Sequence, residues 1–315
     1  MPDEKAKKAA DDALQRLMAE LEKGHSEALK NYLTAMGRFH RYSWNNVLLI
    51  HSQKPEATRV AGFHTWHDLG RSVKKGEKGI MILAPVIVKH KDAPTPAEDK
   101  PIKPEESRRL AGFRTAYVFD VSQTDGKPLP EFAKATGDPQ QYTDKLKALV
   151  ARQGIELTYD DSIKPAQGVS TGGKIRLVPG LSRAEEFSVL THELAHEMMH
   201  HRKDVERQAT VVKETQAEAV AYVVCRGVGL QTNTAASDYI KLYNGDKKTL
   251  ADSLADIQET SSKILDELVP EQQRAIQRDK VPTSTQSMPA SQAHPVQAPP
   301  VATPADPSDT MVWDR

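Results

Sequence analysis

The sequence predicts an α+β protein with two domains, residues 8–135 and 136–270, and a disordered tail at 281–315. The first domain is expected to mix helices with a sheet, because helical hydrophobic periodicity alternates there with short β-branched runs. The second domain carries a His-Glu-x-x-His pattern within an amphipathic stretch, which predicts a metal-binding helix. From about residue 281 onward Pro, Ser, Thr, Gln and Ala dominate, a composition typical of disorder. The length of 315 residues is sufficient for two cores of ordinary size.

Helices and short strands alternate along the first domain. Residues 8–37 have the apolar spacing of a helix, interrupted near Gly24, and Ser43 is placed to cap a second helix over 43–50. The remaining elements are predicted strands at 60–63, 80–88 and 115–121, a helical turn at 64–71, a basic turn at 74–79 and a polar, proline-dotted loop at 90–112.

The second domain begins with a predicted helix at 139–153, and strands are expected near 155–160 and 173–179. Two further helices follow, one containing the histidine pattern and one over 213–224, and residues 235–268 are also predicted to be helical. A strand beside the motif helix can hold an extended peptide by edge pairing. The strand at 173–179 is the best candidate for that role.

Three residues of the motif helix, His192, Glu193 and His196, have the spacing of a zinc peptidase site. Histidines four apart lie on the same face of a helix, so their ring nitrogens can converge on one zinc ion at about 2.0–2.1 Å. Glu193 is then placed to act as the general base toward a water molecule that the metal activates. Ser182 and Glu185 form a predicted capping box at the start of this helix.

A catalytic zinc needs a third protein ligand, and the next predicted helix offers two acids on one face, Glu214 and Glu218. Small apolar residues surround Glu218, which favours it as the third ligand and Glu214 as the acid that orients a ligand histidine. The opposite assignment, in which the two glutamates exchange roles, and a simple ion-pairing helix face are the alternatives. His200 continues the histidine stack about 6 Å further along the helix axis and is expected at the rim of the site.

Basic charge gathers in residues 30–91, which hold 11 Lys or Arg and 3 Asp or Glu, although the net charge of the chain is zero. Such a block indicates a polyanion-binding domain. Cations interleaved with aromatic rings are typical of single-strand binding, with phosphates on Lys or Arg and bases stacked on the rings. The rings in or near the block are Tyr32, Phe39, Tyr42, Trp44, Phe63, Trp66, Tyr117 and Phe119, of which half or more are expected in the core. Lys74, Lys75 and Lys78, in a glycine turn, are stronger candidates for phosphate contacts.

Cysteine content and hydropathy narrow the class of protein. Cys225 is the only cysteine, so no disulfide can form within the chain, and a reducing compartment is expected. A membrane span needs about 18 consecutive apolar residues, and no apolar run approaches that length. The N-terminus is charged and has no apolar core behind it, so we expect no secretory signal. We therefore expect a cytoplasmic protein without a membrane partner.

Four motifs of the first domain resemble the ArdC family of antirestriction proteins: Tyr42–Asn46, Arg59–Trp66, Val73–Ile80 and Tyr117–Thr124. The resemblance covers about residues 8–135 and implies a single-stranded DNA-binding domain, which also occurs in TraC-type primases. Within these motifs and the basic block, the predicted DNA contacts are Trp44, Asn45, Arg59, Trp66, Lys74, Lys75 and Lys78.

The second half of the chain is similar to the metallopeptidase domain of ArdC, on His192–His196 and Gln216–Ala219, and more distantly to SprT-like and ImmA/IrrE-type peptidases. This resemblance implies a zincin-like domain with zinc as cofactor. It also implies Glu218 as the third ligand, because in that class the Glu that is followed by Ala binds the metal. ArdC proteins are borne on conjugative plasmids and other mobile elements and are implicated in protecting incoming DNA from restriction.

We therefore expect an antirestriction protein of a mobile element that binds single-stranded DNA and carries a zinc-dependent peptidase site. Its protein substrate is not specified by the sequence, and restriction enzymes are candidates. Two alternatives use the same parts. One is a non-catalytic protein that shields single strands and holds a structural metal, and the other is a protease that acts on protein crosslinked to DNA.

Overall fold

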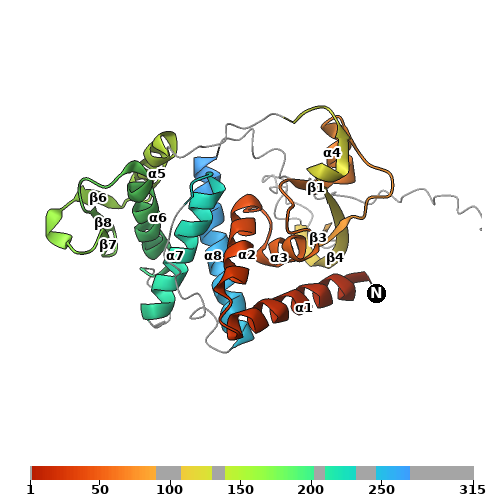
Figure 1. The fold of residues 1–315 in the computed structure, drawn as a ribbon, viewed down its shortest axis with the longest axis horizontal. Coiled ribbons are helices and arrows are strands. Elements are labelled where there is room, and N and C mark those ends of the chain that lie inside the picture. The colour runs from red at the N-terminus through yellow and green to blue at the C-terminus, as the bar shows by residue number, and fades with distance from the viewer. Residues whose placement is uncertain (1, 90–107, 130–138, 202–209, 232–245, 270–315) are drawn as a thin grey trace, which may run out of the picture. The chain divides into compact units, whose positions relative to one another are not determined.

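Helices dominate both halves of the chain in the computed structural model, which describes residues 2–89, 108–129, 139–201, 210–231 and 246–269 (Figure 1). The predicted tail at 281–315, most of the predicted loop at 90–112 and the first part of the predicted helix at 235–268 lie outside the described residues. Mixed helices and sheets confirm the α+β class. In the part of the chain that is described, no helix combines the length and the apolar character needed to cross a bilayer.

The chain opens with α1 (Pro2–Glu22), α2 (Ser26–Arg38) and α3 (Trp44–Gln53). The break between α1 and α2 falls at Gly24, as predicted. The Ser43 side chain accepts a hydrogen bond from the backbone N–H of Asn46, which confirms Ser43 as the cap of α3.

A small antiparallel sheet follows, with the strand order β1-β4-β3. Its strands are β1 (Val60–Gly62), β3 (Ile80–Lys89) and β4 (Arg108–Asp120), and the short helix α4 (Phe63–Asp68) follows β1. A separate pair is formed by β2 (Arg71–Val73) and β5 (Thr124–Gly126), which the sequence pattern did not predict. Residues 108–112, predicted as loop, belong to β4, because this segment pairs with the end of β3 across a register shift.

In the described part of the chain, the edge of β3 that faces away from β4 is covered by side chains of α3 and not by another strand. The side-chain amide of Asn46 both donates to and accepts from the backbone of Leu83, at 2.8 Å in each direction. Gln53 does the same for Met81, at 2.9 Å in each direction. Alternate residues of an edge strand present their N–H and C=O groups outward, so two amides spaced seven residues apart on a helix satisfy the edge as a neighbouring strand would.

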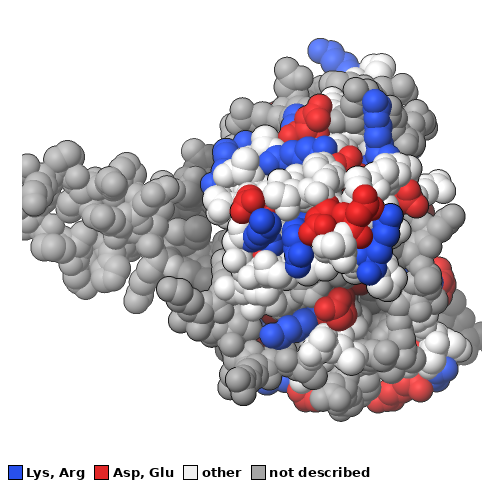
Figure 2. All heavy atoms as spheres, turned by 90° about the vertical axis from the view of Figure 1, so that its left-hand side faces the viewer, with Lys and Arg blue, Asp and Glu red and all other residues white. Residues whose placement is uncertain are grey.

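The second half begins with α5 (Gln140–Arg152), and its sheet has the order β6-β8-β7. Its strands are β6 (Glu156–Tyr159), β7 (Gly168–Ser170) and β8 (Lys174–Leu177), and three longer helices follow, α6 (Arg183–Met199), α7 (Thr210–Gly227) and α8 (Lys247–Leu268). Opposite charges are interspersed over this sheet (Figure 2). Lys174 lies 3.1 Å from Glu156 and Arg176 lies 3.5 Å from Asp160. This face therefore lacks the single-sign charge that a polyanion-binding surface requires.

Helix α7 lies between α6 on one side and α2 and α8 on the other (Figure 1). Its apolar residues are buried nearly all round, from Ala217 to Cys225, as expected for a central helix. Gly37 of α2 allows a close approach, because a Cβ atom there would lie 2.7 Å from the carbonyl oxygen of Val223. The buried apolar residues of both halves form one cluster, and residues 1–281 form one compact unit. The helices of the first half are therefore packed directly on a helix that carries candidate site residues.

Candidate metal centre and nucleic-acid surface

The rotation of helix α6 about its axis is fixed by the cap at its N-terminus and by the burial of its apolar face. Ser182 and Glu185 form the predicted capping box, with each side chain bonded to the backbone of the other residue. Phe187, Leu190 and Leu194 are completely buried. Two adjacent polar stripes result, residues 192, 196 and 200 toward α7 and residues 193, 197 and 201 toward β7 and the turn that follows it.

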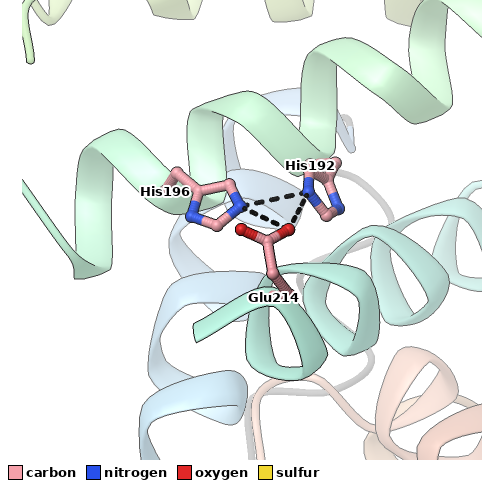
Figure 3. A group of neighbouring side chains, drawn as sticks. All are labelled: His192, His196 and Glu214. Carbon is pink, nitrogen blue, oxygen red and sulfur yellow. Dashed lines mark hydrogen bonds and ion pairs between the residues drawn. The ribbon is translucent and has the colours of Figure 1, made fainter. Parts of the chain in front are cut away.

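Three donor atoms meet between α6 and α7 (Figure 3). The Nε2 atoms of His192 and His196 are 3.1 Å apart. Oε2 of Glu214 lies 3.5 Å from Nε2 of His192 and 3.4 Å from Nε2 of His196. Ligands at about 2.0–2.1 Å from a tetrahedral ion are separated from one another by about 3.3–3.4 Å. The three atoms are therefore spaced as the ligands of one zinc-sized ion would be.

The structure places Glu214, and not Glu218, in this group. Oε2 of Glu218 lies 3.4 Å from Nδ1 of His192, on the opposite side of the imidazole ring from Nε2. Glu218 is one helical turn further along α7, about 6 Å away, so its carboxylate reaches only the outer edge of that ring. This is the geometry of a carboxylate that orients a ligand histidine. The arrangement corresponds to the alternative in which the two glutamates exchange their predicted roles.

The electrostatics of the group favour a cation. Burial disfavours the charged form of His192, but the carboxylates of Glu214 and Glu218 outweigh burial and raise its pKa to about 9. Burial and the neighbouring charge of His192 lower the pKa of His196 to about 4. Hydrogen bonding to His192 lowers the pKa of Glu214. Two imidazoles and an ionised carboxylate are the donor set of a catalytic zinc site with one open position, so the residues fit a divalent ion.

Glu193 is buried, with 7 % of its surface exposed, and burial raises the pKa of its carboxyl group. It accepts hydrogen bonds from the backbone and the side chain of Ser170 in β7. Gly168, two residues earlier in β7, has no room for a side chain, because a Cβ atom there would lie 2.8 Å from Oε1 of Glu193. Glu193 therefore lies between α6 and β7, with its proton affinity raised as a general base requires.

Among the described residues, the edge strand of this sheet that borders Glu193 is β7, so the sequence-based choice of 173–179 was wrong. β8, which lies in that range, is the central strand and pairs on both sides. The β7–β8 turn is anchored to α6, because Glu197 accepts hydrogen bonds from the N–H groups of Gly172 and Gly173, at 2.9 and 2.7 Å. The sequence pattern missed β7 because three residues are too few for a periodic signal.

Trp66, a predicted DNA contact, belongs to the core instead. It is fully buried and its Nε1–H donates a hydrogen bond to the carbonyl oxygen of Phe119 at 2.9 Å. Trp44 is partly buried against the hydrophobic core, while Asn45 and Arg59 are partly exposed. A Trp with its ring enclosed and its N–H satisfied has no face left for a base, so the sequence-based choice of Trp66 is corrected.

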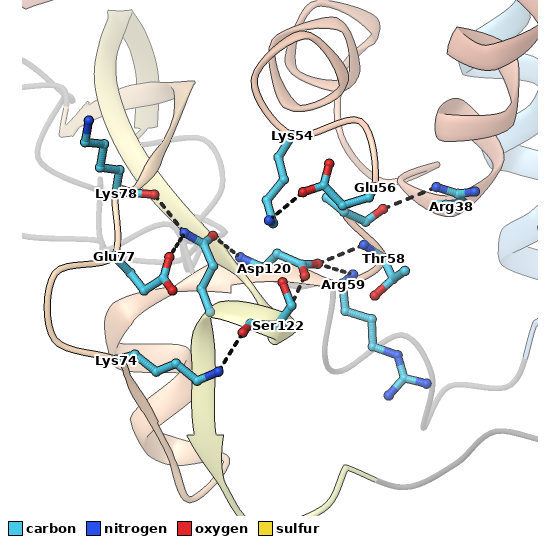
Figure 4. A network of polar contacts seen from close by, with 12 residues as sticks. Arg38, Lys54, Glu56, Thr58, Arg59, Lys74, Glu77, Lys78, Asp120 and Ser122 are labelled. Atoms are coloured by element: carbon cyan, nitrogen blue, oxygen red, sulfur yellow. Dashed lines mark hydrogen bonds and ion pairs between the residues drawn. The ribbon is translucent and has the colours of Figure 1, made fainter.

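The basic turn between β2 and β3 exposes its three lysines, Lys74, Lys75 and Lys78. Lys74 donates a hydrogen bond to the carbonyl oxygen of Ser122 at 3.0 Å (Figure 4). The side chain of Gln123 holds the turn by donating to the carbonyl oxygen of Lys78 at 2.9 Å. The lysines therefore project from a fixed backbone, as phosphate contacts require.

Three aromatic rings are exposed on α4 and β4, and none of them is among the seven predicted contacts. Phe63, Phe113 and Tyr117 are 54 %, 41 % and 51 % exposed. Phe113, Tyr117 and Phe119 are separated by even numbers of residues in β4 and so lie on one face of the sheet. Phe63 meets Phe119 edge to face, with the ring centroids 6.5 Å apart. The period-two spacing of these rings was the signal in the sequence that could have identified the face.

A buried carboxylate, that of Asp120, connects the segment before β1 to the end of β4 by hydrogen bonds (Figure 4). It accepts hydrogen bonds from the N–H groups of Thr58, Arg59 and Ser122, at 2.8, 3.0 and 2.9 Å. Burial opposes ionisation, but these donors outweigh burial and lower the pKa of Asp120. One side chain thus joins the residues before β1 to the end of β4.

Asp120→Asn is expected to reduce the free energy of unfolding by about 1–3 kcal/mol, because an amide nitrogen would face buried N–H donors. The folded-state pKa of Asp120 is depressed, so its contribution is complete above the unfolded-chain pKa of about 3.9 and is lost as the pH falls through the folded-state pKa. Urea unfolding between pH 7 and pH 2.5 measures both effects. The variant should be less stable at pH 7 and show a shallower acid-induced loss. Equal acid slopes for both proteins would contradict the assignment.

Comparisons with known proteins agree with this architecture. Residues 7–119 match the family model of the N-terminal domain of anti-restriction factor ArdC. The fold is similar to crystal structures of the antirestriction protein ArdC from plasmid R388, in metal-free and Mn(II)-bound forms, with TM-scores of 0.50 and 0.51 and 18% sequence identity. These matches cover 82% of this chain and 96% and 97% of those chains.

A curated relative, the uncharacterized protein pXO2-81 of Bacillus anthracis, is 24% identical over 322 residues, which include 88% of this chain. The chain spans about half the length of that relative, 54%. The ArdC N-terminal domain lies on the helices and the sheet that precede the candidate metal centre, and the ArdC fold extends over most of the chain. Residues 7–119 thus form an ArdC N-terminal domain, and the fold of the chain as a whole is similar to that of ArdC.

Proposed function

We propose that this protein is an antirestriction factor that binds single-stranded DNA and hydrolyses a protein substrate at a zinc site. The observation that carries the peptidase half of the proposal is the spacing of the His192, His196 and Glu214 donor atoms, with buried Glu193 beside them. The antirestriction role is supported by the similarity to the R388 protein, which is an antirestriction protein. The metal site is supported by the Mn(II)-bound form of that protein.

The chain's own residues supply the parts of a hydrolytic site. When bound, a zinc ion would act as a Lewis acid toward water and the scissile carbonyl group. His192, His196 and Glu214 would hold the ion, and Glu218 orients His192 through Nδ1. Glu193, whose pKa is raised by burial, accepts the proton of the attacking water and can deliver it to the leaving amine.

The edge of β7 that faces away from β8 is the proposed binding position for the peptide, through the backbone groups that remain beside the Ser170 N–H bonded to Glu193. An edge strand offers unpaired N–H and C=O groups that can add one more strand, and alternate side chains of the peptide then enter pockets on one face. β7 begins at Gly168, which packs on Glu193, so a peptide paired with this strand would lie beside the general base. Glu197 fixes the turn that follows β7 and so keeps the strand in place.

The DNA-binding surface is proposed to comprise the exposed rings of Phe63, Phe113 and Tyr117 together with Lys75 and Lys78. Gly79 joins the basic turn to this ring surface, since a Cβ atom there would lie 2.9 Å from Cβ of Tyr117. A strip of phosphates on the lysines with bases on the adjacent rings is the usual arrangement of sequence-independent single-strand binding.

Substitutions on this surface should separate stacking from charge. Tyr117→Ala is expected to weaken single-strand binding by about 1–3 kcal/mol and to leave its salt dependence unchanged. Lys75→Ala with Lys78→Ala should reduce the slope of log K against log salt by about 0.7 for each phosphate that the variant no longer neutralises. Fluorescence anisotropy with a labelled oligonucleotide, measured over a range of salt, gives both quantities. Lys174→Ala, on the charge-balanced face, is the control, and parallel behaviour of all variants would refute this surface.

The antirestriction role predicts that expression of the protein raises the entry of unmodified plasmid DNA into a restricting host, measured as conjugation efficiency against a non-restricting host. Wild type, Glu193→Gln and the double lysine variant should be compared. Loss of protection in both variants is expected if cleavage near bound DNA is the mechanism. Protection that survives Glu193→Gln would favour the shielding alternative, and no protection by the wild type would refute the role.

Cleavage of a restriction enzyme by the purified protein, with single strands present and chelator absent, would identify the substrate by mass spectrometry. Cleavage of DNA-crosslinked protein, with restriction enzymes left intact, would favour the repair alternative.

A further inference from the structure

A chain of hydrogen-bonded polar side chains leads away from His196 on the side of its ring opposite to the donor group. Nδ1 of His196 lies 3.0 Å from Nδ1 of His200, the residue that caps the C-terminus of α6. Nε2 of His200 lies 3.1 Å from Oε1 of Gln216 in α7. The Nε2 amide of Gln216 in turn donates to Oγ of Ser253 in α8 at 3.2 Å. Gln216 and Ser253 are both buried.

The direction of every hydrogen bond in this chain follows from the position of the first ring. Nε2 of His196 faces His192 and Glu214 and must keep its lone pair free to bind a cation. A neutral His196 then carries its proton on Nδ1 and donates it to Nδ1 of His200. His200 therefore carries its own proton on Nε2 and donates it to the carbonyl oxygen of Gln216.

The remaining link is consistent with this direction, because the oxygen of the Gln216 amide faces His200 as an acceptor and its nitrogen faces Ser253 as a donor. Each group in the chain has one role, and no donor faces a donor. A hydrogen-bonded chain with one allowed direction fixes the tautomer and the plane of the ring at its end.

We propose that His200 is a positioning residue, which holds His196 in the tautomer and orientation that metal binding requires, and that Gln216 in turn orients His200. This inference rests on the proposed metal-binding function. The relay connects α6 to α7 and α8, and α7 also carries Glu214. His200 takes the place of the carboxylate or carbonyl group that usually accepts the outer N–H of a ligand histidine.

The same geometry argues against His200 as a ligand of the ion. Its Nδ1 atom points to the outer nitrogen of His196, and its Nε2 atom points to Gln216. Neither ring nitrogen belongs to the group that Glu214 completes. The two histidines of the pattern thus have different outer partners, Glu218 for His192 and His200 for His196.

Zinc affinity and imidazole nitrogen spectra test this role. His200→Phe should lower zinc affinity about 10–100-fold, as loss of the outer partner of a ligand histidine does. Gln216→Leu should lower it by a smaller factor. His200→Gln should restore most of the affinity, because a side-chain amide can accept from His196 and donate to Gln216. Affinity is measured by competition with a chromogenic chelator, and His67→Phe, at an exposed position of α4, is the matched control.

Long-range ¹H–¹⁵N correlation spectra of the metal-free protein give a second, independent readout. His196 should be protonated on Nδ1 in the wild type and in His200→Gln, and should lose that preference in His200→Phe. The cobalt-substituted wild type and His200→Phe should have the same visible absorption bands, because the ligand set is unchanged. Circular dichroism shows whether His200→Phe is folded. If it is not, the same measurements on Gln216→Leu replace those on His200→Phe.

Three results would overturn the proposal: zinc affinity of His200→Phe within twofold of the wild type, equal losses in His200→Gln and His200→Phe, or cobalt bands that shift as they do when a ligand is removed. A wild-type protein that binds no divalent ion would instead refute the proposed function, while the nitrogen spectra would still test the hydrogen-bond chain.

Discussion

Glu214→Ala is expected to lower zinc affinity more than Glu218→Ala does. The loss expected for Glu218→Ala is about 10–100-fold. The physical reason is the position of each carboxylate around His192. Glu214 approaches Nε2 of both histidines, at 3.5 and 3.4 Å, and can share an ion with them, whereas Glu218 reaches only Nδ1 of His192. Removal of Glu214 would therefore take away a proposed ligand, whereas removal of Glu218 would take away a side chain that orients one.

Competition titration with a chelator, at fixed pH, separates these two outcomes. Cobalt-substituted Glu218→Ala should keep the absorption bands of the wild type, while those of Glu214→Ala should change because a ligand is missing. Glu259→Ala, an exposed position of α8, is the control for removal of a glutamate from a helix surface. If Glu218→Ala proves the weaker binder and alters the bands, Glu218 is the third ligand, as the sequence pattern favours, and the approach of Glu214 to the two Nε2 atoms does not persist with metal.

Glu193→Gln is expected to reduce peptide hydrolysis by at least about 100-fold, as loss of a general base does. The amide has nearly the same size as the carboxylate, so the packing against Gly168 is kept, but it cannot accept a proton. Glu193 is not a member of the donor group, and zinc affinity should therefore stay close to that of the wild type. Single-strand binding should also be unchanged, because the proposed DNA surface lies on α4, β4 and the turn before β3.

The measurement is the rate of cleavage of an identified protein substrate by zinc-loaded enzyme, with zinc content and oligonucleotide affinity determined on the same preparations. Ser188→Ala, at a part-buried position of α6 outside the donor group, controls for a change in that helix. Undiminished hydrolysis by zinc-loaded Glu193→Gln would exclude Glu193 as the general base. Loss of both hydrolysis and zinc would mean that the substitution acts through metal binding.

Local sequence was sufficient for the features that depend on one helix. The capping box at Ser182 and the four-residue spacing of His192 and His196 are properties of a single α-helix, and the structure has both. Helix α3 and its Ser43 cap were predictable for the same reason. The class of the fold followed from such local patterns, added along the chain.

Features that depend on packing between elements were not predictable in the same way. Glu214 and Glu218 lie on one face of α7, so periodicity treats them alike, and only the packing of α7 on α6 determines which carboxylate lies opposite the two Nε2 atoms. Trp66 and Tyr117 are both aromatic residues near basic ones, yet burial of one and exposure of the other depend on how β4 covers α4. β7 is too short to be seen in sequence, and its edge position is a property of the sheet order.

The amino-acid sequence alone determined the family resemblance, the helix that carries the two histidines and Glu193, and the separation of a basic region from the metal-binding helices. The tertiary structure decided which glutamate lies beside the two Nε2 atoms, which rings face solvent and which side chains contact the outer ring nitrogens of the two histidines. The reason is physical: helical spacing is set by backbone geometry within one segment, whereas the partner of a side chain is set by the distance and rotation between segments, which depend on the packing of the whole core.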